Sequence, residues 1–318
     1  MTTANTVTPN DIRIGTLVGA GMQSPQYIEQ ILDYGFESFS LTFWQTTKGI
    51  DWQKLADGVN RAIDGSDAVI SSLAIFGNPL ETEEKDQTTL KGWEECIDHA
   101  HLFNCDIVGG FTGRLRGKPI HESLPRFKEI FSVLAQRAAD KGVKIAFENC
   151  DMGGTWRSGD WNIAHNPTAW EMMFNEVPAA NLGLEWEPCH HMVSLIDPMP
   201  QLQEWAGKIF HVHGKDATIY WQRIRKYGIH TSFHEDVALE SGVQPVKPFA
   251  YHRTPGFGDS DWTAIISELR ATGYKGSIDI EGWHDPVYRG DLEMTGQVHA
   301  LNYLKNCRGG SYVPNPSV

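Results

Sequence analysis

The sequence lacks a membrane-spanning apolar run, paired cysteines and a glycine-rich nucleotide-binding motif. No apolar stretch approaches about 18 residues, the length that a transmembrane helix requires. The N-terminal segment MTTANTVTPNDIR has neither a basic start nor an apolar core, which predicts no signal peptide. The five cysteines form no CxxC pair, so we expect free thiols and a cytoplasmic protein. No GxGxxG or GxxxxGKS/T motif follows an expected strand, which disfavours an open nucleotide-binding sheet.

Positive charge is also scarce. The chain carries 27 lysine and arginine residues against 40 aspartate and glutamate residues, a formal net charge of −13. Nucleic-acid binding draws most of its affinity from basic side chains that neutralise phosphates, so this balance predicts no nucleic-acid partner. It also argues against binding to an anionic membrane surface. The expected partner is therefore a small molecule, and a homo-oligomer is left open because no specific interface can be recognised.

Short apolar runs alternate with longer helical patterns along most of the chain. Eight runs are expected to form strands, at residues 13–19, 36–43, 68–77, 106–111, 143–149, 181–187, 208–214 and 276–282. Such alternation predicts parallel strands joined by right-handed helical crossovers. Eight units favour an α/β fold in which one (β/α)₈ TIM-barrel domain spans residues 1–318. Two connections, at about 150–166 and 217–260, are long for βα loops and are expected to be lids or binding loops.

Four of the expected strands end in side chains that can bind a metal ion. Glu148, Glu187, His213 and Glu281 end the fifth to eighth strands. Consecutive strand ends of a parallel barrel meet at one rim, so these side chains are expected to converge. Three buried carboxylates would repel one another by several kcal/mol, and a divalent cation would remove that cost. The donor set favours one hard ion, Mn²⁺ first, with Mg²⁺, Co²⁺ or Zn²⁺ as alternatives.

The stretches AFEN, LGLEWEPCH, FHVHGKD, PGFGDSDW and IDIEGW occur in this order along the chain. Together they resemble the sugar phosphate isomerase/epimerase family, the xylose isomerase-like TIM barrels, over about residues 13–306. That family includes 3-epimerases, inosose dehydratases and apurinic endonucleases. The resemblance implies a metal set of Glu, Asp, His and Glu, which Glu148, His213 and Glu281 match directly. Glu187 stands at the Asp position, a departure that adds one methylene to the side chain.

The resemblance also implies a chemistry. Glu148 and Glu281 would face opposite sides of one carbon and relay its proton, while His190 matches a histidine that binds substrate hydroxyls. Lys215 and Asp216 match a Lys-Asp pair of the dehydratase-like branch, which makes Lys215 a further catalytic candidate. The implied activity is that of a metal-dependent isomerase or epimerase. It would act on a keto-sugar or related polyol by proton abstraction next to a carbonyl, through a metal-bound enediolate.

Two other functions stay open at this point. Loss of a β-substituent at the same site would make the chain a lyase or dehydratase acting on a 3-keto-glycoside or an inosose. A non-catalytic sugar-binding barrel is a more remote alternative. The acidic charge opposes apurinic endonuclease activity, which needs a basic groove.

Several side chains are candidates for contact with the sugar because they lie near strand ends or in the long loops. His211 precedes His213 by two residues on one strand, so both side chains are expected on the same face. Eleven tryptophans are more than a core of this size requires, and sugar stacking competes with core filling as their role. The substrate-binding candidates are His190, His211, Trp44, Arg114, Trp156, His165 and Arg253.

Overall fold

The structure, a computed structural model, describes residues 11–231, 246–282 and 284–309. Within these ranges eight parallel strands close into a barrel in the order β1-β10-β7-β6-β5-β4-β3-β2. The barrel strands are β1 Arg13–Gly19, β2 Ser38–Trp44, β3 Val69–Phe76, β4 Ile107–Gly110, β5 Lys144–Glu148, β6 Leu182–Trp186, β7 Ile209–Gly214 and β10 Ser277–Ile280. Each of the eight expected runs overlaps one barrel strand, and the closed parallel barrel confirms the (β/α)₈ fold class.

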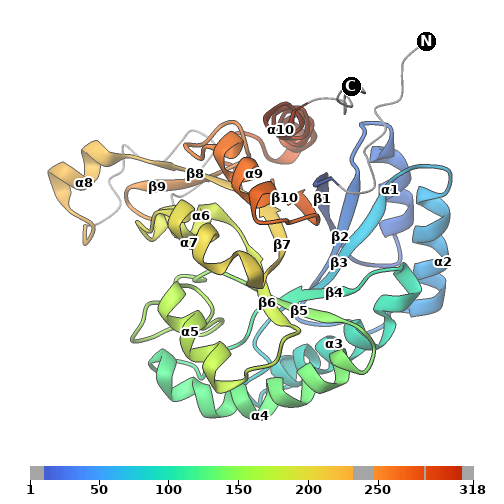
Figure 1. The fold of residues 1–318 in the computed structure, drawn as a ribbon, viewed down its shortest axis with the longest axis horizontal. Helices are drawn as coiled ribbons and strands as arrows, with labels where there is room; N and C mark the ends of the chain where they lie inside the picture. The colour runs from blue at the N-terminus through green and yellow to red at the C-terminus, as the bar shows by residue number, and fades with distance from the viewer. Residues whose placement is uncertain (1–10, 232–245, 283, 310–318) are drawn as a thin grey trace, which may run out of the picture.

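Helices cover the outside of the barrel between successive strands (Figure 1). None of the described helices is both long enough and apolar enough to cross a membrane. The helices are α1 Ser24–Leu32, α2 Trp52–Ile63, α3 Glu84–His99, α4 Ile120–Ala139, α5 Pro167–Glu176, α6 Pro188–Val193, α7 Pro198–Trp205, α9 Trp262–Ala271 and α10 Glu293–Arg308. Short 3-10 turns occur at Ala100–Phe103, Ala206–Lys208 and Gly290–Leu292.

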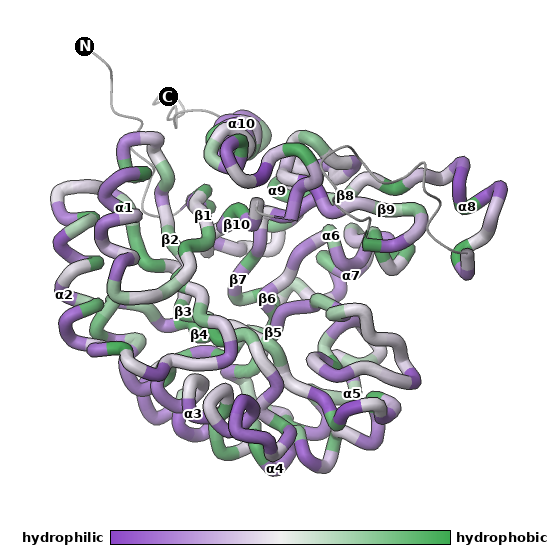
Figure 2. Tube along the Cα trace, turned by 180° about the vertical axis from the view of Figure 1, so that it is seen from behind, coloured by the Kyte–Doolittle hydropathy of each residue, from purple (hydrophilic) through white to green (hydrophobic). Residues whose placement is uncertain are grey.

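The helices follow from capping and apolar spacing, as α2 illustrates. Asp51 precedes the helix, and its side chain accepts a hydrogen bond from the Lys54 backbone amide. Leu55, Ala56 and Val59 are buried at positions three and four residues apart, so one face of the helix packs on the barrel. Figure 2 shows the same division across the molecule, with mostly hydrophobic barrel strands and hydrophilic residues along the outer helices.

Several of the eleven tryptophans fill the core, whereas two that were candidates for sugar contact are exposed. Four tryptophans are fully buried, whereas Trp44 and Trp156 are 56% and 38% exposed. Core filling therefore accounts for part of the high tryptophan content. The four buried tryptophans are Trp93, Trp170, Trp186 and Trp262.

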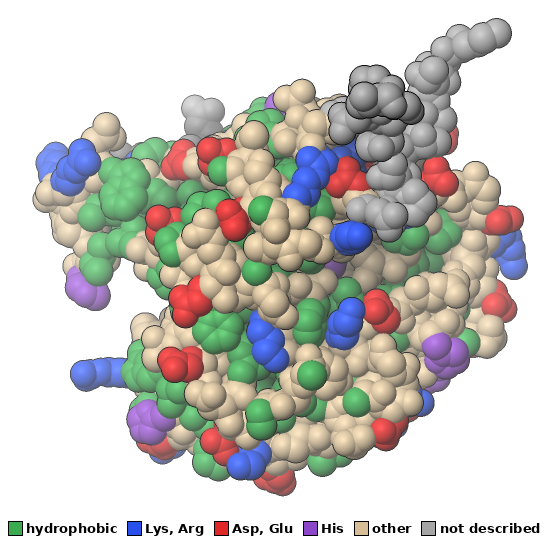
Figure 3. Space-filling model, in the orientation of Figure 1, with side chains coloured by type: hydrophobic (Ala, Val, Ile, Leu, Met, Phe, Trp, Pro, Cys, Tyr) green, Lys and Arg blue, Asp and Glu red, His purple; other side chains and the backbone are tan. Residues whose placement is uncertain are grey.

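The chain after β7 departs from a simple strand–helix unit. β8 Asp216–Ile219 and β9 Ala250–Arg253 form an antiparallel pair outside the barrel, and α8 Trp221–Tyr227 lies between them in sequence. Figure 1 shows this arm projecting from the barrel, and Figure 3 shows a hollow in the surface below it. Residues 232–245, part of the long connection expected at 217–260, lie outside the described residues.

The other long connection, residues 150–166, is irregular, and the Asn162 side chain holds its start against the barrel. The Asn162 amide donates hydrogen bonds to the carbonyl oxygens of Glu148 and Cys150, each at 2.8 Å. Its side-chain oxygen accepts from the Thr112 hydroxyl at 2.6 Å. The loop therefore starts in a fixed position beside the end of β5.

Candidate functional site

Four side chains converge inside one end of the barrel, as their strand-end positions predict. Glu148 ends β5, Glu187 follows β6, His213 lies near the end of β7, and Glu281 follows β10. Each offers one donor atom, and these atoms all lie within 4.8 Å of one another. All four side chains are buried. The structure thus brings together three carboxylates and one imidazole with little access to water.

Some carboxylate oxygens of this cluster accept hydrogen bonds from the protein, and others do not. Glu281 Oε1 accepts a hydrogen bond from Lys215 Nζ at 2.7 Å and lies 3.1 Å from His284 Nδ1. Glu281 Oε2 and both oxygens of Glu187 are buried without a hydrogen-bond partner among the described residues, although His190 Nε2 faces Glu187 Oε1. Unpaired buried carboxylate oxygens are costly, and a ligated cation satisfies them. The donor set fits a divalent ion of the Mn²⁺ or Mg²⁺ type.

Burial and neighbouring charges give the two cavity-facing carboxylates opposite pKa shifts. Burial raises the pKa of Glu148, and the charge of Glu281 adds to the rise while the His213 hydrogen bond reduces it. Burial also acts on Glu281, but the Lys215 ammonium and the neighbouring His213 and His284 imidazoles outweigh it, so its pKa lies well below the usual range. Burial would lower the pKa of Lys215, but the Glu281 charge outweighs it and raises that pKa. Lys215 and Glu281 therefore form a charged pair beside the more basic Glu148.

A chain of buried polar groups lies beneath these side chains and orients His213. His213 Nε2 lies 3.2 Å from Glu185 Oε1, and His211 Nδ1 lies 2.8 Å from the same oxygen. His211 Nε2 in turn lies 2.7 Å from Asp279 Oδ2. Burial by itself raises the pKa of Glu185, but the two imidazoles outweigh it and lower the pKa to about 2. With Nε2 directed at Glu185, His213 presents Nδ1 to Glu148, at 3.0 Å.

Glu185 and Asp279 are the participants that sequence reasoning missed. Each precedes an expected metal ligand by two residues, so the strand period of two places it on the same inward face. That signal was available, since it also relates His211 to His213. Glycine makes room for the chain of groups, because a Cβ atom at Gly109 would approach Glu185 Oε1 to 2.5 Å.

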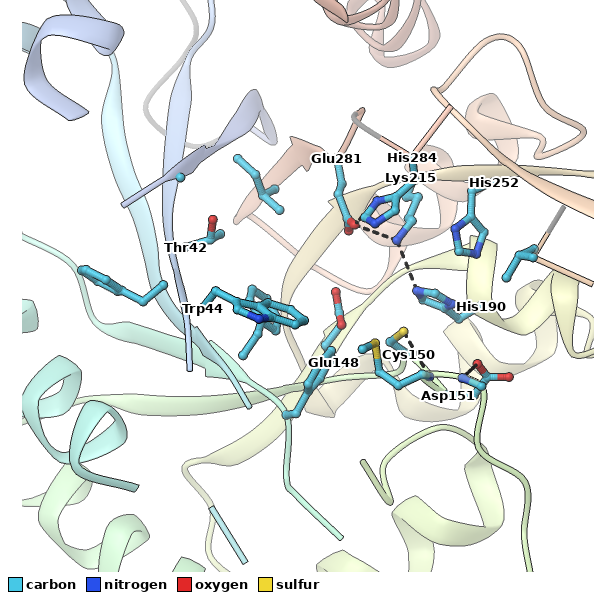
Figure 4. A pocket seen from close by; sticks show the side chains of 18 residues that line it. Thr42, Trp44, Glu148, Cys150, Asp151, His190, Lys215, His252, Glu281 and His284 are labelled. Carbon is cyan, nitrogen blue, oxygen red and sulfur yellow. Dashed lines mark hydrogen bonds and ion pairs between the residues drawn. The ribbon is translucent and has the colours of Figure 1, made fainter. Parts of the chain in front are cut away.

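A cavity of about 480 Å³ opens onto this cluster (Figure 4). Glu148 and Glu281 both line it, and Trp44 lies across from His190 and His252 in the close-up. Phe76, Phe111 and Leu17 add apolar surface to the lining. A cavity with apolar rings and a few polar groups is typical of a site for a small hydroxylated molecule.

Burial would lower the pKa of His213, but the neighbouring carboxylates, Glu185 first, outweigh it and raise that pKa. The imidazoles of the cavity wall shift in the other direction. Burial lowers the pKa of His190 and of His252 well below the usual range, and the nearby Lys215 ammonium lowers both further. His284, which also lines the cavity, was not predicted from the sequence. Cys189, His190 and His252 also offer donor atoms within 4.8 Å of one another. However, the Lys215 ammonium lies 3.4 Å from His190 Nε2, which places a positive charge where a second cation would bind.

Two arginines expected to contact the sugar are engaged elsewhere in this structure. Arg114 is fully buried and donates hydrogen bonds to the carbonyl oxygens of Lys118, Thr155 and Trp156. Arg253 Nε lies 3.0 Å from a carboxylate oxygen of Asp285. Neither arginine lines the cavity that holds Glu148 and Glu281. Their guanidinium groups hold the loops together, because a buried guanidinium requires several acceptors.

The remaining substrate-binding candidates lie in three different places. Trp44 and His190 line the cavity, and their contact with a substrate stays a prediction. His211 is fully buried beneath it and contacts Glu185 and Asp279 instead. Trp156 and His165 line a second pocket beside the 150–166 loop.

Solved structures share this fold at low sequence identity, which by itself shows the fold alone. The apo form of the 3-keto-D-glucoside 4-epimerase YcjR from E. coli matches with a TM-score of 0.64 and 15% identity, over 93% of this chain and 100% of that one. An L-ribulose 3-epimerase matches with a TM-score of 0.61 and 16% identity, over 93% and 92% of the two chains. A dehydratase of Bacillus anthracis, described as a probable 3-DHS dehydratase, matches with a TM-score of 0.62 and 13% identity, over 93% and 99%.

The chain also matches one curated sequence relative and one family model. The rhizopine catabolism protein MocC of Rhizobium meliloti is 30% identical over 192 residues, which is 60% of this chain. That match spans about half of the relative's own length, 49%. The family model described as Xylose isomerase-like TIM barrel matches residues 28–307, most of the chain. Because the closed barrel agrees with this match, the chain belongs to the xylose isomerase-like TIM barrel family.

Proposed function

We propose that this chain is a divalent-metal-dependent isomerase or epimerase that acts on a keto-sugar or related polyol by abstracting a proton next to a carbonyl. The supporting observation is the donor set of Glu148, Glu187, His213 and Glu281, with open carboxylate oxygens beside a sugar-sized cavity. We infer Mn²⁺ as the ion, with Mg²⁺, Co²⁺ or Zn²⁺ as alternatives, because carboxylates dominate the set.

The two cavity-facing carboxylates, Glu148 and Glu281, act at different stages of the proton transfer. When bound, the cation would supply positive charge that offsets the negative charge developing on the substrate carbonyl oxygen. Glu148 and Glu281 enter the cavity from different strand ends, so one can remove the proton and the other can return one. Return to the opposite face of the same carbon gives an epimer, and return to the neighbouring carbon gives an isomer.

Other cavity residues hold the substrate in place. Lys215 fixes the Glu281 carboxylate by its 2.7 Å hydrogen bond and presents its ammonium group to the cavity. The neutral imidazoles of His190 and His252 offer donors and acceptors to sugar hydroxyls. Trp44 supplies a flat apolar surface for the C–H face of a sugar ring.

The test is a turnover screen of 3-keto-glycosides, ketohexoses and inososes in deuterated water. Metal-depleted protein is assayed with and without Mn²⁺, and products are read by mass spectrometry. We expect ion-dependent deuterium incorporation into a product whose mass is otherwise unchanged. Glu148→Gln and Glu281→Gln should each abolish turnover, whereas Glu171→Gln, at an exposed position of α5, should not.

Each alternative outcome has a distinct meaning. Near-normal activity of either cavity variant, or full activity after exhaustive chelation, would contradict the proposed mechanism. Release of water or an aglycone would instead assign a lyase or dehydratase. Sugar binding without deuterium exchange would assign a binding protein.

A further inference from the structure

The cavity that holds Glu148 and Glu281 has a polar half and an apolar half. All the ionisable side chains that line it in the described part of the chain come from the end of β5 or from later segments. Figure 4 shows Lys215 and His190 on one side of the cavity and Trp44 on the other. The groups that can transfer a proton or bind a hydroxyl are therefore concentrated on one side of any ligand.

The apolar half comes from β1, β2, β3 and the residue that follows β4. Its one polar side chain among the described residues is Thr42, whose hydroxyl donates a hydrogen bond to the Val18 carbonyl oxygen at 3.3 Å. A sugar hydroxyl turned toward this half would lose its hydration and find few side-chain partners in return, which is costly. This half therefore suits an apolar part of the ligand. Its lining side chains are Leu17, Thr42, Phe43, Trp44, Phe76 and Phe111.

Three rings of the apolar half, those of Phe76, Phe111 and Trp44, form an aromatic wall that begins beside the candidate ion site. The Phe76 ring lies 6.4 Å from the His213 ring, centroid to centroid, and meets Phe111 edge to face at 5.0 Å. Trp161 packs against Phe76 and Phe111, and its ring lies 5.5 Å from that of Trp44. Because Trp44 is 56% exposed, the aromatic wall reaches from His213 to the surface of the molecule.

The exposed indole of Trp44 is held in place by its neighbours. Gln45, the next residue, has a φ of 60°, in the left-handed region that side chains with a Cβ atom rarely adopt. Its backbone amide donates to the Phe76 carbonyl oxygen at 2.7 Å, and its carbonyl oxygen accepts from the Thr89 hydroxyl at 3.0 Å. Such backbone strain persists where the surroundings enforce it, and it is common at ligand sites. The turn at Gln45 and the contact with the Trp161 ring together fix the indole beside the cavity.

We propose that the substrate is a keto-glycoside with an aromatic aglycone, and that the aglycone lies along the aromatic wall while the sugar ring faces Glu148 and Glu281. The volume of about 480 Å³ leaves room for a substituent as well as a sugar ring. An aromatic group suits this wall better than an alkyl group, because offset and edge-to-face ring contacts add to the burial of apolar surface. The inference rests on the proposed function, because it places the reacting carbon beside the two carboxylates.

The test measures binding, which requires no turnover. The full chain with Mn²⁺ is titrated in a calorimeter with three glycosides that differ only in the aglycone: methyl, cyclohexyl and phenyl β-glucoside. We expect phenyl β-glucoside to bind about tenfold more tightly than the methyl glycoside and about threefold more tightly than the cyclohexyl glycoside. Trp44→Ala should reduce the preference for phenyl over methyl to about twofold, and Trp44→Phe should keep most of it. Trp221→Ala, at a 52% exposed position on α8, is the matched control and should keep the full preference.

A turnover assay separates failure of this inference from failure of the proposed function. Methyl and phenyl 3-keto-β-glucoside are incubated with the protein and Mn²⁺ in deuterated water. A phenyl preference that depends on Trp44 supports the aglycone site even if neither keto-glycoside exchanges deuterium, a result that would count against the proposed function alone. Equal affinities for the phenyl and methyl glucosides, a preference unchanged in Trp44→Ala, or cyclohexyl binding as tight as phenyl binding would each overturn the inference, whether or not deuterium is incorporated.

Discussion

Replacing Glu187 by glutamine should have opposite effects on the protein without and with its ion. Both oxygens of Glu187 are buried and accept no hydrogen bond from the described residues, although His190 Nε2 and Lys215 Nζ face Oε1. Two further carboxylates of the cluster lie nearby. Glutamine preserves the shape, removes the charge and adds a donor that can face Glu148 or Glu281. We therefore expect the metal-free variant to be more stable than metal-free wild type, and metal binding to be weakened.

The expected size follows from the distances. At an effective dielectric constant of about 20, a carboxylate at the 4.8 Å limit repels Glu187 by about 3.5 kcal/mol. Lys215 Nζ at 3.9 Å offsets about 4 kcal/mol of the repulsion from the two neighbours. Since His213 offsets part of the rest, neutralising Glu187 should increase the free energy of unfolding by about 1 to 2 kcal/mol.

Calorimetric melting with and without Mn²⁺ measures both effects. An ion at about one hundred times its Kd stabilises the fold by about 2.7 kcal/mol. With about 2.1 cal/mol/K of unfolding entropy for each of the 318 residues, that is a Tm increase of about 4 °C for wild type. Metal-free Glu187→Gln should melt about 2 °C higher than metal-free wild type and gain less than about 1 °C from the ion. A variant that melts lower without Mn²⁺, yet gains as much from it as Glu171→Gln does, would refute the reasoning.

Two further predictions concern Glu185 and His165. Glu185→Gln should weaken Mn²⁺ binding by about 10 to 100 fold in a calorimetric titration, because the side chain orients His213; unchanged affinity would contradict this role. Burial lowers the pKa of His165 from 6.5 to about 4, so the folded state binds fewer protons and stability is lost as pH falls from 6.5 towards 4. Between pH 7.5 and pH 5, the free energy of unfolding of wild type, measured in urea, should therefore fall by about 2 kcal/mol more than that of His165→Gln. Equal falls in the two proteins would contradict the lowered pKa of His165.

The residues at the strand ends could be predicted from the sequence better than the contacts of the loops. Alternation of apolar runs and helical patterns is enough to predict a parallel barrel, and a barrel places consecutive strand ends at one rim. Glu148, His213 and Glu281 could therefore be grouped before any coordinates were known. The same reasoning extended by one strand period would have included Glu185.

Loop contacts were harder to predict because backbone carbonyl groups leave no pattern in a sequence. Arg114 was a reasonable candidate for binding sugar hydroxyls, yet three loop carbonyls occupy its guanidinium. The β8–β9 pair was also missed, because its strands are four residues each and 30 residues separate Ile219 from Ala250. Strands this short carry too few positions for a periodic signal.

The buried chain from Asp279 through His211 and Glu185 to His213 makes ion affinity sensitive to the interior of the barrel. Its members are fully enclosed, so any loosening of the strands that admits water would weaken their mutual attraction and release His213. Mn²⁺ at the proposed site would then be held less tightly. Affinity for the proposed ion would thereby report on the packing of the barrel interior under heat or denaturant.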